Sequence, residues 1–121
     1  MDLTPDDTPV AYTINRYVSG EVFIDGTGYT KPLILTRDGF RALAISQAQD
    51  LTSDHIQSWQ QENPFDLVVI GTGPSHELLP DLAAYCFAKR IGFECMTSQS
   101  AARIHSILMA EHRAFLMVLF P

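Results

Sequence analysis

The sequence predicts a single mixed α/β domain, and three observations carry this prediction. The chain has 121 residues, of which 46% are hydrophobic and 18% charged. A chain of this length buries roughly two-thirds of its extended surface, which is enough for one core. Short apolar runs separated by glycine turns occupy the first part of the chain, as in antiparallel hairpins. The second half alternates apolar runs with helical segments, which predicts a β-α-β-α-β unit with helices packed on a mixed sheet.

The first residues differ in composition from the rest of the chain. Residues 1–9 are rich in aspartate and contain two prolines. Such a segment has little apolar surface to bury against a core, and chain ends fray readily. We therefore expect a disordered acidic tail over residues 1–9 and a single folded domain over residues 10–121.

Two antiparallel hairpins are predicted in the first third of the chain. The first turn begins at Asp25-Gly26, a pair that is favoured where both central turn residues need a positive φ. The second turn lies at Arg37-Asp38-Gly39. The strands around these turns are predicted over residues 22–24, 29–35 and 40–45.

Three helices are predicted from residues that favour helix ends. Thr52 or Ser53 can cap the first helix, and proline at position 80 suits the first position of the second. Gly92 is the expected left-handed cap at the end of the second helix, and Ser98 is the expected cap of the third. The helices are predicted over residues 51–63, from residue 80 to just before residue 92, and over 98–111.

Three apolar runs alternate with the last two helices. They are predicted as strands over residues 65–70, 93–96 and 114–120. The first and the last are continuously apolar, as expected for strands that are covered on both faces of a sheet. Most of the core is therefore expected in the second half of the chain.

The net charge of −6 restricts the partners of the domain. Binding to a phosphate backbone depends on clustered cations, so nucleic acid is not an expected partner. The whole excess of acidic residues falls within residues 1–66, whereas residues 67–121 carry equal numbers of acids and bases. The acidic first half therefore argues against a nucleic-acid partner without excluding a small anion beside the second half.

Neither a targeting segment nor a disulfide pattern is evident. The start of the chain lacks the basic and apolar stretches of a secretory signal, and no apolar run is long enough to span a membrane. The protein is therefore predicted to be cytoplasmic. Its two cysteines, Cys86 and Cys95, fit no paired-thiol or zinc spacing and are expected to be reduced. No cofactor and no metal are predicted.

The candidate site lies beyond the carboxyl ends of two predicted parallel strands, where ligands collect in open α/β sheets. A glycine-rich turn follows residues 65–70, and two hydroxyl residues follow residues 93–96. A basic residue, Arg103, lies one turn into the third helix, which points at the glycine turn. The turn resembles part of a dinucleotide-binding fingerprint, but its third glycine is replaced by His76. The predicted ligand or partner surface consists of Gly71, Thr72, Gly73, Pro74, Thr97, Ser98 and Arg103.

The histidines do not assemble a recognisable catalytic or metal motif in the sequence. His76 follows the glycine turn, but no Ser-His-Asp or Cys-His arrangement can be assigned to it. His105 and His112 are seven residues apart on the third helix, and no further ligand is in register with them. No catalytic residue is therefore predicted.

These segments together resemble a family of unknown biochemical function that includes bacterial members and the mitochondrial respiratory complex I assembly factor 3. The similarity covers residues 12–121. It is carried by Gly26-Thr27-Gly28-Tyr29, residues 64–73, Pro80, residues 91–96, Ala101-Ala102-Arg103, Glu111, Arg113 and the apolar ending at Pro121. The chain departs from the family at Ile104-His105-Ser106, where members have Thr-Tyr-Asn.

The resemblance implies a fold and a function. The implied fold is a mixed sheet with helices on one side and extra antiparallel strands on the other. The implied function is that of a non-enzymatic protein-interaction domain linked to the assembly of a respiratory complex. A protein partner of unknown identity is then expected, and a homodimer is compatible with it. The alternative is a small anionic-ligand-binding protein or enzyme that uses the Gly71-Thr72-Gly73 loop and the helix start at Ser98.

Overall fold

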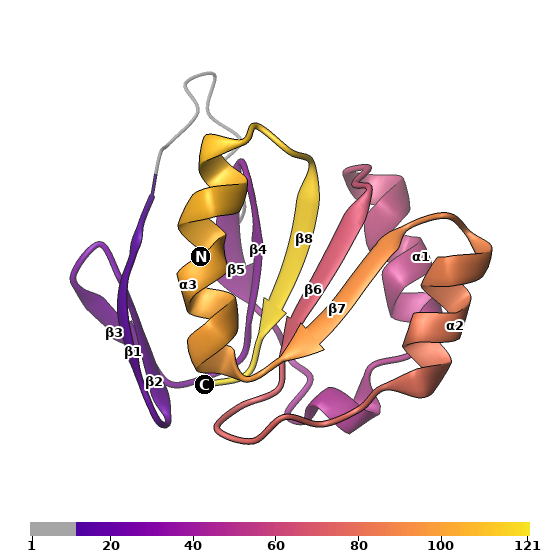
Figure 1. Ribbon diagram of the computed structural model, residues 1–121. Coiled ribbons are helices and arrows are strands. Elements are labelled where there is room, and N and C mark those ends of the chain that lie inside the picture. Colours follow the sequence, from indigo (N-terminus) through magenta and orange to yellow (C-terminus); the bar gives the residue numbers. More distant parts are fainter. Residues whose placement is uncertain (1–11) are drawn as a thin grey trace.

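The computed structural model describes residues 12–121, and the predicted tail over residues 1–9 lies outside them. The described residues form three α-helices, a five-stranded sheet and a separate three-stranded sheet (Figure 1). The prediction of a mixed α/β fold is confirmed. None of the helices in this part of the chain has the length and the apolar character needed to cross a membrane.

The large sheet has the strand order β5-β4-β8-β6-β7. Its central strand β6 is parallel to both β7 and β8, and β4 is antiparallel to both β5 and β8. The predicted β-α-β-α-β unit with parallel strands is therefore confirmed. All residues of β6 and β8 are buried, because both faces of the sheet are covered. The strands are β4 Leu33–Thr36, β5 Gly39–Ala42, β6 Leu67–Gly71, β7 Gly92–Met96 and β8 Phe115–Leu119.

The small sheet is an antiparallel meander of β1 Ile14–Val18, β2 Glu21–Ile24 and β3 Thr27–Tyr29. Its second turn has φ angles of 50° at Asp25 and 86° at Gly26, as the sequence predicts. The expected continuous strand over residues 29–35 is wrong. Tyr29 ends β3, and Leu33 begins β4 in the other sheet. Pro32 has no N–H group for a ladder, and it lies in the segment that passes between the sheets.

Helices cover both faces of the large sheet. Helices α1 (Ser53–Glu62) and α2 (Pro80–Ala88) pack on one face, whereas α3 (Ser98–Ala110) shares the other face with the small sheet (Figure 1). The expected arrangement with all helices on one side is therefore wrong. The chain passes from β6 to β7 in one direction and from β7 back across β6 to β8 in the other. Right-handed crossovers in opposite directions place α2 and α3 on opposite faces.

One of the two predicted caps begins α1, whereas the end of α2 is formed by a residue other than the one expected. Thr52 caps α1, and its N–H donates to Nδ1 of His55 over 3.0 Å, which completes a capping box. At the end of α2 the left-handed residue is Arg90, with a φ of 61°, and not Gly92. Gly92 begins β7, where an added Cβ would lie 3.1 Å from the Cδ1 atom of Leu67. A side chain at this position would therefore require the Leu67 side chain to shift.

Candidate functional site

Ser98 joins three elements at the carboxyl end of β6. The cap of α3 is Thr97, whose side chain accepts a hydrogen bond from the N–H of Ser100, so the expected cap at Ser98 is wrong. Ser98 instead is the first helical residue and is fully buried. Its Oγ donates to the carbonyl of Phe120 over 2.6 Å and accepts from the N–H of Gly73 over 2.8 Å. We call Gly73, Ser98 and Phe120 the Ser98 network.

The neighbouring residues of the glycine turn are also bonded within the protein. Thr72 donates its hydroxyl to the carbonyl of Ser75 over 2.6 Å and accepts from the N–H of Glu77 over 3.1 Å. An added Cβ on Gly71 would lie 3.1 Å from the Cβ of Ala101, so glycine permits the close approach of α3. These groups hold the turn against α3 and β8, and their hydrogen-bonding capacity is used inside the fold.

The other predicted site residues lie along a surface groove beside α3. Pro74 and Thr97 line a hollow of about 360 Å³, and Arg103 lines a second hollow of about 270 Å³. Both hollows touch Tyr17 of β1 and Gln99 of α3, so they adjoin one another. We call them together the β1–α3 groove. Its lining residues are Ile14, Asn15, Arg16, Tyr17, Val18, Ser19, Pro74, Thr97, Gln99, Ala102, Arg103 and Ser106.

The structure thus divides the predicted surface into two groups. Gly71, Thr72, Gly73 and Ser98 are buried and support the end of the sheet. Pro74, Thr97 and Arg103 border the groove. The β1 residues of the groove could not be found from the sequence, because no local pattern indicates that residues 14–19 lie beside residues 99–106.

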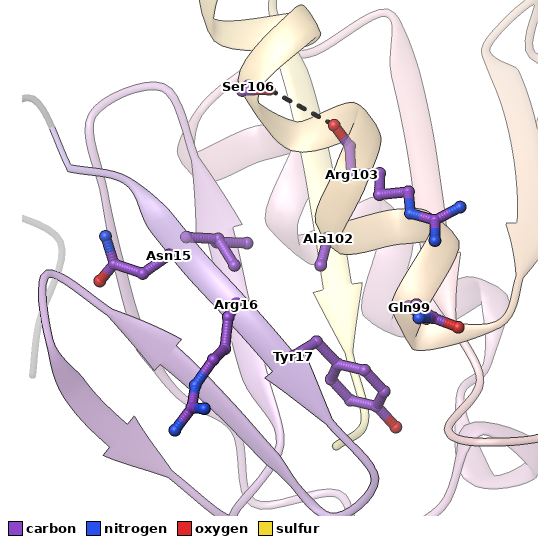
Figure 2. A pocket seen from close by; sticks show the side chains of 8 residues that line it. Asn15, Arg16, Tyr17, Gln99, Ala102, Arg103 and Ser106 are labelled. Carbon is purple, nitrogen blue, oxygen red and sulfur yellow. Dashed lines mark hydrogen bonds between the residues drawn. The ribbon is translucent and has the colours of Figure 1, made fainter.

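The side chains of the groove suit binding better than acid–base chemistry. Its lining residues include no aspartate, glutamate, histidine or cysteine. The guanidinium of Arg16 lies 4.3 Å from the centre of the Phe23 ring and points away from α3 (Figure 2). The Tyr17 hydroxyl is buried and has no hydrogen-bond partner within residues 12–121. The groove therefore offers apolar surface and hydrogen-bond donors, but no carboxylate or imidazole to accept a proton.

A buried histidine lies on the inner side of the same helix. Nε2 of His105 is 3.0 Å from the hydroxyl oxygen of Tyr12, which in turn donates to the carbonyl of Thr36 over 2.6 Å. Because that hydroxyl hydrogen is used on Thr36, Nε2 of His105 is the donor to Tyr12. Burial lowers the pKa of His105 to about 4, so the imidazole is neutral at neutral pH. Burial, with a smaller effect from the charge of Asp38, raises the pKa of Tyr12.

The triplet Ile104-His105-Ser106, which departs from the family pattern, lies partly in the core and partly at the groove. His105 is buried in the core that α3 forms with the small sheet, whereas Ser106 lines the β1–α3 groove. Ile104 is partly buried and packs against the same core. Only one of the three residues therefore contributes to the groove surface.

One pairing that the sequence did not indicate involves Cys95 and His76. The Sγ atom of Cys95 on β7 lies 3.7 Å from Nε2 of His76 in the turn before α2. Within residues 12–121 no three side chains of histidine, cysteine, aspartate or glutamate gather as metal ligands. The other cysteine, Cys86, is fully buried, and burial raises the pKa of its thiol to about 11. Both cysteines are free thiols.

We expect iodoacetamide to modify one cysteine in the native protein and two in denaturant. Cys95 is partly exposed, whereas the Cys86 thiol is shielded and stays protonated at neutral pH. Intact-mass measurement and peptide mapping should place the native label on Cys95. The Cys95→Ser variant should remain unlabelled until it is unfolded. Equal rates at the two cysteines in the native protein would contradict this expectation.

The fold and the groove together define a class of protein: a small mixed α/β domain with a lateral groove beside its smaller sheet. The chain belongs to the DUF498/DUF598 family of proteins of unknown function, whose model matches residues 14–120. None of the curated proteins matches the chain.

Solved structures of bacterial proteins share the fold. A protein of Bordetella parapertussis is 25% identical, with a TM-score of 0.81 over 96% of this chain and 99% of its own. A protein of Xanthomonas campestris is 21% identical, with a TM-score of 0.77 over 99% of this chain and 92% of its own. A Mth938-like domain of Bordetella pertussis is 23% identical, with a TM-score of 0.74 over 100% of this chain and 92% of its own. These likenesses establish the architecture and assign no activity.

Proposed function

We propose that this domain is a non-enzymatic protein-interaction module and that it holds an extended segment of a partner protein in the β1–α3 groove. The observation that carries the proposal is the pairing of a strand edge with a helix face along one groove. The cytoplasmic location and the role in assembling a respiratory complex belong to the same proposal. They rest on the sequence and on the family resemblance.

One wall of the groove is suited to strand addition. Within residues 12–121, β1 pairs with β2 alone, so its other edge has no strand partner. Figure 2 places β1 as the strand of the small sheet that lies nearest α3. An extended peptide that adds to such an edge gains main-chain hydrogen bonds, and pockets beside the edge select its side chains.

The other wall is one face of α3. Gln99, Ala102, Arg103 and Ser106 follow the spacing of three and four residues that places side chains on a single helix face. Ala102 leaves room between the helix and β1, while Gln99 and Arg103 supply donors. Since no carboxylate lines the groove, an extended segment with an acidic residue at the level of Arg103 suits it.

The proposal is tested by affinity capture with groove variants. Tagged protein should recover a reproducible partner from the cells that encode it, with the partner identified by mass spectrometry. Ala102→Arg fills the groove and Arg103→Glu reverses its charge, so each should reduce the captured partner about tenfold, as expected for the loss of a central contact. Arg90→Glu makes the same charge change on the opposite face of the large sheet and should leave capture unchanged.

The alternative function, binding of a small anion at the Gly71-Thr72-Gly73 loop and the helix start, is less well supported. The Gly73 N–H and the Ser98 hydroxyl are bonded to one another, so neither is free for a ligand. A thermal-shift series with phosphate, nucleotides and carboxylates separates the two functions. Stabilisation that Arg103→Ala abolishes would favour the anion. An unchanged melting temperature throughout, together with partner capture, would favour the interaction module.

A further inference from the structure

The outward face of α2 is an apolar surface with an exposed aromatic side chain. The inward residues Leu82 and Cys86 are 3% and 0% exposed, whereas Phe87 on the outward side is 85% exposed. We define the α2 apolar face as the exposed residues Pro80, Ala84, Phe87 and Ala88. Figure 1 shows α2 at the side of the domain remote from α3 and the small sheet. The face is therefore separate from the β1–α3 groove.

The composition of α2 is unusual for a helix with one side toward solvent. Asp81 is its only charged residue between Pro80 and Ala88. Helices at protein surfaces normally carry polar residues opposite the buried stripe, and helices that are apolar on all sides are normally covered. Removing a phenylalanine side chain from water is favourable, so covering Phe87 stabilises an assembly.

We propose that the α2 apolar face binds the same face of a second copy of this chain, with the two α2 helices antiparallel. The charges at the two ends of α2 favour this occupant. Asp81 lies in its first turn, and Lys89 and Arg90 are exposed just beyond its last turn. Two antiparallel copies place the acidic end of each helix beside the basic end of the other, and they also oppose the two helix dipoles.

The register of this pairing follows from the position of Ala84. Ala84 is the middle residue of Pro80–Ala88, so a two-fold axis there brings two small side chains together at the crossing. With a rise of about 1.5 Å per residue, Asp81 of one copy then lies within about 3 Å, measured along the helix axis, of Lys89 in the other. Phe87 of each copy packs beside Pro80 and Asp81 of the other.

Pairing through the neighbouring sheet edge is disfavoured. Strand β7 is the edge strand next to α2, and its middle residue Glu94 is exposed. Antiparallel pairing of two β7 strands about Glu94 would place two carboxylates opposite one another, and charged residues on edge strands oppose such pairing. A contact through one nine-residue helix is small compared with the roughly 1,000 Å² of a stable interface, so the dimer should dissociate at micromolar concentrations.

Sedimentation velocity over a concentration series tests the proposal on the whole chain. The native protein should shift from monomer to dimer as its concentration rises through the micromolar range. Phe87→Glu should raise the dissociation constant about tenfold or more, because it places a charge in the apolar contact. Ile107→Glu, which makes the same change at an exposed isoleucine of α3, should leave the constant unchanged. Circular dichroism melting confirms that each variant is folded.

Charge variants test the antiparallel register. Asp81→Lys and Lys89→Glu should each weaken self-association, because each brings like charges together at both ends of the helix pair. An equimolar mixture of the two variants should form a heterodimer, because both end contacts then join opposite charges. A protein that stays monomeric into the millimolar range, a dimer that Phe87→Glu does not weaken, or a mixture without heterodimer would overturn the proposal. The Arg103→Glu groove variant should still dimerise, which keeps this test independent of partner capture.

Discussion

Replacing Ser98 with alanine is expected to lower the free energy of unfolding by about 2 to 4 kcal/mol. The substitution removes a hydroxyl that donates to the Phe120 carbonyl over 2.6 Å and accepts from the Gly73 N–H over 2.8 Å. Both backbone groups would then lie buried without these partners, and each such group costs about 1–3 kcal/mol. The loss should be visible as a lower midpoint in urea unfolding, with little change in the slope.

Ser106→Ala is the matched control for this experiment. Ser106 lies on the same helix, is exposed, and donates only to the Arg103 carbonyl one turn earlier. Exposed substitutions of this kind usually change stability by less than about 0.5 kcal/mol. If Ser98→Ala were as stable as Ser106→Ala, the Ser98 network would not hold the end of the sheet together.

The second large effect concerns pH. The pKa of His105 falls from 6.5 to about 4 on folding because the imidazole is buried. Between these two pH values the unfolded chain binds a proton at His105 that the folded chain does not. Acid therefore favours unfolding in this window. The contribution of His105 to the free energy of unfolding is fully present above pH 6.5. It is lost as the pH falls toward 4, and the loss amounts to about 3 kcal/mol.

The His105→Gln variant isolates this contribution. Glutamine is neutral over the whole range and keeps an amide donor for the Tyr12 hydroxyl. The free energy of unfolding should fall for both proteins between pH 7 and pH 4. The fall should be about 3 kcal/mol smaller for the variant than for the native protein. All other residues are the same in the two proteins, so their contributions cancel in the comparison. A nuclear magnetic resonance titration that placed the pKa of folded His105 near 6.5 would contradict the prediction.

The second half of the fold could be predicted because each element carries its own local signal. Continuous apolar runs specify β6 and β8, and Pro80 specifies the start of α2. The side of the sheet on which each helix lies is not a local property. It follows from the strand order β8-β6-β7, which reverses the direction of the second crossover. The family resemblance did not supply that order, so the expected placement of the helices was wrong.

The candidate site was predictable only in part. The end of β6 was located correctly, but the Gly73 N–H beside it donates to the Ser98 hydroxyl, which in turn donates to the Phe120 carbonyl. Both partners are distant from the turn in the sequence. At the start of α3, Thr97 and Ser98 can each cap a helix, and only the burial of Ser98 against Phe120 determines which does so. The contribution of β1 to the groove depends on its packing against α3, which lies about 80 residues later in the sequence. No local motif indicates such a contact.

The central position of β8 has a consequence for the order in which the domain can form during synthesis. Of the five strands of the large sheet, β8 is synthesised last, yet it lies between β4 and β6. Until residues 115–119 are available, neither of these earlier strands has its native neighbour on that side. Pairings between distant segments form slowly, and unpaired strand edges invite wrong contacts in the meantime. The sheet must therefore carry two open strand edges until β8 is synthesised and inserts between them.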